Sequence, residues 1–136
     1  MNYTKRSQIN KISMQVRCEG LNKIFYKDHL SSFLVVKALK GSKDIEEVWR
    51  SKTVDKTFNP VFEGVFEVSY SFEGIVFLIS LENTRYIFEI YHEATPASPF
   101  ARLRTTVKEL LSAPNRILAR ELDTGFKKGG KITINS

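Results

Sequence analysis

The sequence predicts an all-β fold, a sandwich or barrel of short strands, from three observations. Apolar and polar residues alternate over several short runs, as they do when successive side chains of a strand point to opposite faces. Helical periodicity is confined to one short segment, Thr106–Ser112. Turn-forming residues separate the runs, at positions 41–42, 59–60, 96–99, 113–115 and 129–130.

The alternating runs give the expected strands. Strict alternation, as in the first and last runs, indicates a half-buried strand, whereas the apolar-rich runs at 33–39 and 86–91 indicate more central strands. The run at 47–54 is more polar. In chain order, we expect strands at Ile12–Cys18, Phe33–Leu39, Glu47–Val54, Phe66–Glu73, Tyr86–Tyr91 and Lys131–Asn135.

Length and composition indicate one globular domain. The chain has 136 residues, of which 42% are hydrophobic and 26% charged, a balance that permits one closed core. We expect residues 1–8 to form a flexible tail and residues 9–136 to form the domain. The single cysteine, Cys18, excludes an internal disulfide. The polar start and the short longest apolar run, Ile75–Leu81, predict a cytoplasmic domain with at most peripheral membrane association.

Positive charge exceeds negative charge. The chain has 21 Lys and Arg against 15 Asp and Glu, a net charge of +6. Such a surface attracts anionic partners such as acidic lipid or nucleic acid, although solubility alone also explains it. The C-terminal bases lack an aromatic pair that would stack on nucleotide bases, so nucleic acid is the disfavoured partner.

The sequence motifs of enzymes are missing. His29 and His92 are far apart and have no third metal ligand at suitable spacing, and the sequence contains neither a phosphate-binding glycine loop nor a nucleophile elbow. Cys18 lies on the apolar face of its expected strand, so we interpret it as a buried hydrophobic residue and not as a nucleophile. We therefore expect no catalytic residue and no small-molecule substrate.

One block of the sequence carries a family resemblance. Trp49–Val54 is a basic segment that leads into Asn59-Pro60-Val61-Phe62. This arrangement resembles C2 domains, in which a strand ending in Lys-Thr precedes an Asn-Pro turn followed by an aromatic residue. Phe88–Tyr91 resembles the strand that enters the third C2 loop. The segments Phe66–Glu73 and Gly130–Ile134 are similar to the first C2 domain of copines.

The resemblance sharpens the expected architecture. It implies an eight-stranded antiparallel Greek-key β-sandwich, C2-like, with at most one short helix. It also implies that residues 74–85 form a longer connection than C2 domains usually have at that point.

The resemblance further implies that the calcium site is degenerate. Calcium takes six to eight oxygen ligands, several of them anionic. The matched ligand positions hold no carboxylate, and only Asp28 and Glu93 remain as acids in those loops. We therefore expect no cofactor, and calcium is disfavoured. A shifted site using Asp28, Glu93 and backbone carbonyls is kept as an alternative. The degenerate positions are Phe25, Ser31, His92, Ala94 and Pro99.

A basic concave face is the predicted binding surface. In related domains that bind phosphoinositides, the positions matched by Lys37, Arg50 and Lys52 are basic, and an aromatic residue stands where Tyr91 stands here. We therefore predict calcium-independent binding of anionic membrane lipid, phosphoinositide or phosphatidylserine. The alternative for the three bases is a solvated face with acidic partners at Asp44, Glu46 or Glu47.

A first-loop segment is the predicted second membrane contact. Ile24, Phe25 and Tyr26 are consecutive and would insert into a membrane if they were exposed, or would close the end of the sandwich if they were not. The other partner class is a protein. The apolar run Ile75–Leu81, with Phe77 and Ile79, would favour a protein-interaction module without lipid binding if it were exposed.

Overall fold

The computed structural model describes residues 8–24, 29–40, 44–72, 85–125 and 128–136. These residues contain eight strands, and every pairing between them is antiparallel. The fold class predicted from the sequence is confirmed, and the described residues contain one short α-helix, at the predicted position. The strands are β1 (Gln8–Glu19), β2 (Ser32–Lys40), β3 (Asp44–Arg50), β4 (Val61–Phe72), β5 (Arg85–His92), β6 (Ala101–Thr106), β7 (Ile117–Asp123) and β8 (Lys128–Asn135).

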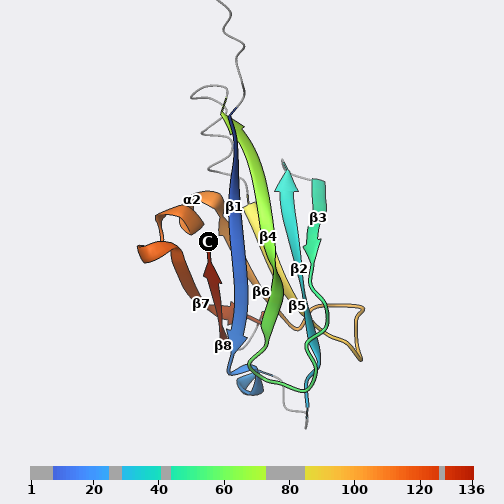
Figure 1. Ribbon diagram of the computed structural model, residues 1–136. Coiled ribbons are helices and arrows are strands. Elements are labelled where there is room, and N and C mark those ends of the chain that lie inside the picture. The colour runs from blue at the N-terminus through green and yellow to red at the C-terminus, as the bar shows by residue number, and fades with distance from the viewer. Residues whose placement is uncertain (1–7, 25–28, 41–43, 73–84, 126–127) are drawn as a thin grey trace, which may run out of the picture.

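The strands follow one another in the order β3-β2-β5-β6-β7-β8-β1-β4 (Figure 1). In the described part of the chain, β6 and β7 are paired only through Arg102 and Asp123. This weak connection divides the strands into two groups of four, β3-β2-β5-β6 and β4-β1-β8-β7, which pack as the two layers of a sandwich.

Alternating side chains from both layers build the core. Leu34 and Val36 of β2 and Phe88 of β5 are fully buried, and they belong to the same core cluster as Ile132 and Ile134 of β8 from the other layer. Each such side chain stabilises the fold by about 1.5–3 kcal/mol relative to its exposure to water. The predicted strands at 33–39 and 86–91 are therefore the central ones of their layer.

One helix closes the sandwich beside the weak β6–β7 connection. Helix α2 (Val107–Ser112) begins at Thr106, whose Oγ1 accepts a hydrogen bond from the backbone N of Glu109. Such a side-chain cap satisfies one of the free amide groups of the first turn. Val107 and Leu110 point into the core, and α2 contacts both β6 and β7.

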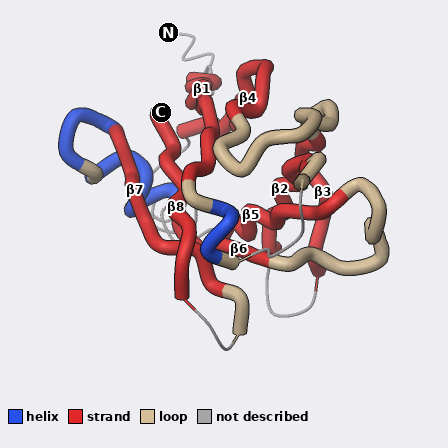
Figure 2. The backbone as a smooth tube through the Cα atoms, turned by 90° about the horizontal axis from the view of Figure 1, so that it is seen from below, coloured by secondary structure: helices blue, strands red, loops and turns tan. Residues whose placement is uncertain are grey.

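Four connections between strands lie at one end of the sandwich, at the bottom of Figure 1 and facing the viewer in Figure 2. The β1–β2 connection includes the short helical turn η1 (Leu21–Lys23), and η2 (Pro114–Arg116) precedes β7 at the other end. Asn59 Oδ1 accepts a hydrogen bond of 2.8 Å from the backbone N of Gly20. The Asn59-Pro60 step therefore joins the β3–β4 connection to the β1–β2 connection.

Several strand bounds differ from the expectations, since β1 already begins at Gln8 and β4 at Val61. The polar strand covers 44–50 instead of 47–54, and residues 51–54 contribute one isolated bridge, between Ser32 and Val54. The strands β6 and β7 had not been located from the sequence. The apolar run 75–81, with Phe77 and Ile79, lies outside the described residues. Among the described residues, no helix has the length and apolar character that crossing a bilayer requires.

Candidate functional site

The predicted binding residues lie on the side of the β3-β2-β5-β6 layer that faces away from the core. Phe33 and Val35 are buried but do not belong to the core cluster, which takes the alternate residues of β2. Directly paired residues of neighbouring strands share a face. Val35 pairs with Arg50 on one side and with Glu89 on the other. The name outer face is used here for Phe33, Val35, Lys37, Glu47, Arg50, Glu89, Tyr91 and Arg102.

An aromatic pair occupies the loop end of the outer face. The rings of Phe33 and Tyr91 stack with a centroid distance of 5.1 Å and an angle of 3° between their planes. The guanidinium carbon of Arg50 lies 5.4 Å from the centroid of the Phe33 ring, a cation–π distance. Aromatic stacking and the cation together fix the orientation of three side chains that come from three strands.

A nearly buried carboxylate holds Lys37 in place. Lys37 Nζ lies 2.7 Å from Glu89 Oε1, and the Tyr91 hydroxyl donates a hydrogen bond of 3.1 Å to the same oxygen. Glu89 is only 8% exposed. The hydrogen bond to Glu89 raises the pKa of Lys37, and burial followed by the charge of Glu89 raises the pKa of Tyr91. Lys37 is therefore a fixed cation at neutral pH.

Arg50 has its own acidic partner. Arg50 Nη2 and Nε donate hydrogen bonds of 2.7 Å and 3.3 Å to the two carboxylate oxygens of Glu47. The hydrogen bond from Arg50 lowers the pKa of Glu47. Both side chains are largely exposed, so the pair stabilises the fold only slightly. Its effect is to orient the guanidinium beside the aromatic pair.

The structure brings together three of the four predicted lipid-binding residues. Lys37, Arg50 and Tyr91 meet on the outer face, whereas Lys52 is exposed just beyond the end of β3. Glu47, one of the acids considered from the sequence as a partner for the bases, is bonded to Arg50. Lys37 instead pairs with Glu89.

Sequence reasoning missed two members of this surface. Phe33 was expected only as part of a strand, and Arg102 of β6 was not considered, although it pairs in register with Glu89. The alternation of Arg102 and Arg104 with Leu103 and Thr105 was a signal that could have placed both arginines outward. With Arg102 included, the outer face carries three bases and two acids.

The positions matched to calcium ligands are engaged in hydrogen bonds at the loop end. The Ser31 carbonyl accepts from the backbone N of Glu93 at 2.8 Å, and His92 Nδ1 lies 3.0 Å from the same oxygen. Since a carbonyl can only accept, Nδ1 carries a hydrogen. Ser31 Oγ accepts from the backbone N of Lys56. His92 is 6% exposed, so its ring fills the space between the loops.

The remaining predicted metal positions form no cluster. Ala94 is exposed and Pro99 is half-buried. Within the described residues, no group of three or more His, Cys, Asp or Glu side chains is placed to hold a metal ion. Phe25 and Asp28 lie outside the described residues, and with them half of the alternative shifted site.

One residue of the predicted insertion loop is described. Ile24 is half-buried and packs against the core, next to Gly130 of β8. Phe25 and Tyr26 lie outside the described residues. Ile24 thus contributes to closing the end of the sandwich, which was the alternative considered for this loop.

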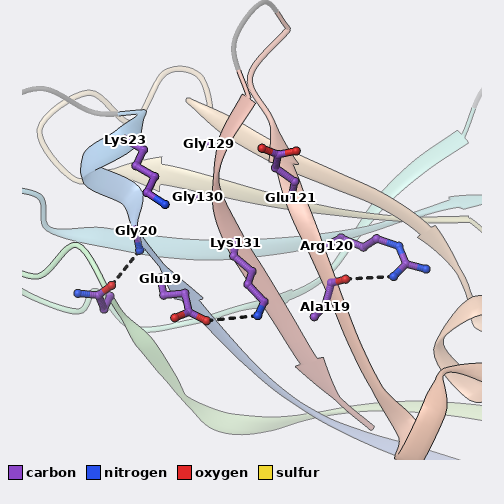
Figure 3. A pocket seen from close by; sticks show the side chains of 10 residues that line it. Glu19, Gly20, Lys23, Ala119, Arg120, Glu121, Gly129, Gly130 and Lys131 are labelled. Carbon is purple, nitrogen blue, oxygen red and sulfur yellow. Dashed lines mark hydrogen bonds and ion pairs between the residues drawn. The ribbon is translucent and has the colours of Figure 1, made fainter.

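A cavity of about 710 Å³ lies on the other layer, beside η1 (Figure 3). The glycines at 20, 129 and 130 line it, and its charged residues alternate in register. Lys131 of β8 stands between Glu19 of β1 and Glu121 of β7, and its Nζ is 3.8 Å from Glu19 Oε1. The lining has three bases and two acids, as the outer face has, but it includes no aromatic side chain, so the cavity is a weaker candidate for a lipid headgroup than the outer face.

Comparisons with known proteins bear on the fold. No family model matches the chain, and no curated protein sequence matches it. Solved structures do match. The structure of CC2D1B, a protein that coordinates ESCRT-III activity during the mitotic reformation of the nuclear envelope, aligns with a TM-score of 0.72 at 15% identity. The alignment covers 98% of this chain and 56% of that one, so the chain spans little more than half of that structure.

Two further structures are C2 domains over most of their length. The C2 domain A of a plant extended synaptotagmin 1 aligns with a TM-score of 0.63 at 16% identity, covering 91% of this chain and 89% of that one. The C2 domain B of BON1 aligns with a TM-score of 0.60 at 16% identity, covering 96% and 90%. Identities this low show the fold alone. The chain has a C2-like β-sandwich fold, and a special similarity to copines is not shown.

Proposed function

We propose that this domain is a non-enzymatic module that binds anionic membrane lipid, phosphoinositide or phosphatidylserine, through its outer face and without calcium. The observation that carries the proposal is the arrangement of Lys37 and Arg50 around the stacked rings of Phe33 and Tyr91. A carboxylate orients each of these cations, Glu89 for Lys37 and Glu47 for Arg50.

The charge of the surface supports a phosphate-bearing ligand. Arg102 and Lys52 add positive charge that the two carboxylates do not balance. A guanidinium presents donors in a planar fork that suits phosphate. The half-buried Tyr91 ring, which Phe33 supports from beneath, is the part of the aromatic pair that a headgroup ring or glycerol backbone can contact. Oriented side chains lose less rotamer entropy when a ligand binds.

The arrangement supports weak attachment. Each base near an anionic leaflet contributes about 1 kcal/mol, and the effect falls off over a Debye length of roughly 8 Å. Four bases and two acids leave a net charge of +2, which gives about 2 kcal/mol and a dissociation constant weaker than millimolar. We propose that a second contact, from the loop that follows Ile24 or from another part of a longer protein, makes binding stable.

The loop end supports calcium independence. In this domain the Ser31 carbonyl already accepts two hydrogen bonds, and His92, at a position that the C2 resemblance matches to a calcium ligand, is a buried ring. A cation entering there would have to displace these contacts without any gain from a cluster of carboxylates.

Co-sedimentation with vesicles tests the proposal. The domain is mixed with vesicles of phosphatidylcholine alone, or with added phosphatidylserine or phosphoinositide, in calcium and in chelator. We expect pelleting only with the anionic lipids, to the same extent in calcium and in chelator. Pelleting that requires calcium, or none with any vesicle, would contradict the proposal.

A charge-matched pair of variants locates the surface. Arg50→Glu combined with Lys52→Glu reverses one exposed base of the outer face and one just beyond the end of β3. Lys108→Glu combined with Arg120→Glu makes the same change in net charge at exposed positions on α2 and β7. We expect the first double variant to lose binding and the second to retain most of it. An equal loss in both would show that net charge alone attracts the domain to membranes.

A further inference from the structure

A second hollow of about 470 Å³ lies on the same layer, at the end opposite to the loops. Two cross-strand rows line it. In the first row, Leu39 of β2 pairs with Ile45 of β3 on one side and with Arg85 of β5 on the other. In the second row, Ile87 of β5 pairs with Arg104 of β6. This hollow is called the distal groove below.

The floor of the distal groove is aliphatic and open to water. Ile45 is 58% exposed, and Leu39 and Ile87 are half-buried. Exposed aliphatic side chains that cluster in a hollow, unlike scattered ones, are typical of surfaces that bind an apolar side chain.

The walls of the distal groove are basic. Arg85 and Arg104 are both exposed, and Glu109 at the start of α2 is the single acid among the lining residues. Within the described ranges, neither guanidinium forms an ion pair with a carboxylate of the chain. This differs from Lys37 and Arg50, which have their carboxylates at 2.7 Å. Two guanidinium groups without acidic partners favour an acidic ligand.

The strand beside the groove favours an extended ligand. β3 stands at the end of the strand order, so its outer edge pairs with no other described strand. Val48 on this strand is also 37% exposed. An open edge of this kind can accept main-chain hydrogen bonds from an extended peptide, whose alternate side chains then reach the neighbouring surface.

We propose that the distal groove binds an extended segment of a partner protein in which carboxylates flank an aliphatic side chain. The aliphatic side chain lies on Leu39, Ile45 and Ile87, and the carboxylates bond to Arg85 and Arg104. A lipid headgroup is the poorer occupant, because it has no aliphatic group to cover the floor.

The distal groove borders the outer face, because Lys37 pairs in register with Ile87, but the groove extends away from the aromatic pair. Phe33 and Leu39 are six residues apart on β2, which corresponds to about 20 Å at roughly 3.3 Å per residue. Variants at Arg85 and Arg104 therefore leave the aromatic pair itself unchanged.

Selection from a phage-displayed library of random dodecamer peptides tests the inference. The purified domain is the bait, and enriched peptides are synthesised and measured by fluorescence polarisation against the parent and its variants. We expect the enriched sequences to place Asp or Glu beside Leu, Ile or Val. Failure to enrich any sequence, or enrichment of basic ones, would overturn the inference.

Two variants identify the groove as the site. Arg85→Glu combined with Arg104→Glu should weaken the selected peptides by about tenfold or more. Ile45→Glu changes the floor at an exposed position and should do the same. Arg17→Glu combined with Arg120→Glu, on the other layer, should leave peptide affinity within a factor of about two, and circular dichroism confirms that each variant is folded.

The same variants distinguish a membrane from a peptide as the occupant. Arg85→Glu with Arg104→Glu should leave vesicle pelleting close to that of the Arg17→Glu with Arg120→Glu control. Loss of pelleting with unchanged peptide affinity would assign the groove to lipid and overturn the inference.

Discussion

Phe33 and Tyr91 occupy the same register position on β2 and β5, and their rings stack almost in parallel at 5.1 Å. The stack links the two central strands of the layer at the point where the loops begin. It also presents a flat apolar surface beside two fixed cations.

Removal of the Tyr91 ring should reduce both stability and lipid binding. We expect Tyr91→Ala to lower the free energy of unfolding by about 1–3 kcal/mol, since it removes the stack and exposes Phe33. Tyr91→Phe keeps the ring and removes only the hydroxyl bonded to Glu89, so its effect should be small. Urea denaturation and vesicle pelleting measure the two effects. A Tyr91→Phe variant as weak as Tyr91→Ala would mean that the hydroxyl, and not the ring, carries the interaction.

The ion pair between Lys37 and Glu89 should contribute to the stability of the domain. Lys37→Gln leaves a nearly buried carboxylate without its cation, and we expect a loss of about 1–3 kcal/mol. Lys37→Gln combined with Glu89→Gln should recover most of that loss in urea denaturation at neutral pH. Lys52→Gln is the matched control and should change stability little. No recovery in the double variant would show that the two side chains contribute independently.

The same ion pair predicts a pH dependence at alkaline pH. Since the pKa of Lys37 is raised in the folded protein, its contribution to stability is fully present below the ordinary lysine pKa. The contribution is lost as the pH rises through the raised value. We therefore expect the stability difference between the parent and Lys37→Gln to shrink at strongly alkaline pH. A difference that stays constant there would contradict the ion pair.

Burial should make Cys18 unreactive in the native state. Burial raises the pKa of its thiol to about 12, so the reactive thiolate is nearly absent at pH 8. We expect a thiol reagent to label Cys18 only as fast as the domain unfolds, with labelling rates that rise with urea. Stability should fall by about 1.4 kcal/mol per pH unit between the unfolded and folded pKa values, because only the unfolded state loses the proton. Cys18→Ala removes this slope, and rapid labelling of the native domain would contradict the burial.

Two glycine positions allow the energetic cost of backbone strain to be measured apart from the cost of steric crowding. Gly130 and Gly125 both have positive φ angles, of 79° and 92°. A Cβ at Gly130 would lie 2.8 Å from Ile24 Cδ1, whereas a Cβ at Gly125 would have no atom within 4 Å. We expect Gly125→Ala to cost about 1–2 kcal/mol from strain alone, and Gly130→Ala to cost more.

A second substitution tests whether Ile24 causes the crowding at Gly130. Ile24→Ala in the Gly130→Ala background should recover the excess loss, as measured by thermal or urea unfolding. Equal losses for the two single glycine variants would mean that Ile24 moves aside freely, and Ile24 would then be a loose part of the loop.

The strands with strict alternation were predictable, and the two that were missed have physical reasons. In β7 Leu118 and Leu122 are buried on one face, but Arg120 between them on that face is exposed, so the apolar alternation is interrupted. A spacing of four fits a helix as well as a strand. The run from Ala101 alternates correctly but is short and follows a loop rich in Pro and Ser, so it did not stand out as β6.

The sequence predicted which basic and aromatic residues the candidate site contains, but not which side chains contact one another there. The positions of Lys37, Arg50 and Tyr91 followed from strand alternation and from the resemblance. The stacking of Phe33 on Tyr91 and the bond from Lys37 to Glu89 depend on which strands are neighbours. Since β2 lies between β3 and β5, and β5 is 45 residues further along the chain, local sequence carries no signal for these pairs.

Among the described residues, β6 and β7 share a single residue pair, so the short helix α2 is important for covering the core between them. Along the other strand boundaries, ladders of hydrogen bonds keep water from the interior. Along the β6–β7 boundary, the buried side chains of Val107 and Leu110 cover the core instead. We therefore expect the sandwich to open first between β6 and β7 in thermal fluctuations. The amide hydrogens of α2 and of the facing edges of β6 and β7 should exchange with deuterium before those in the β1–β8 pairing.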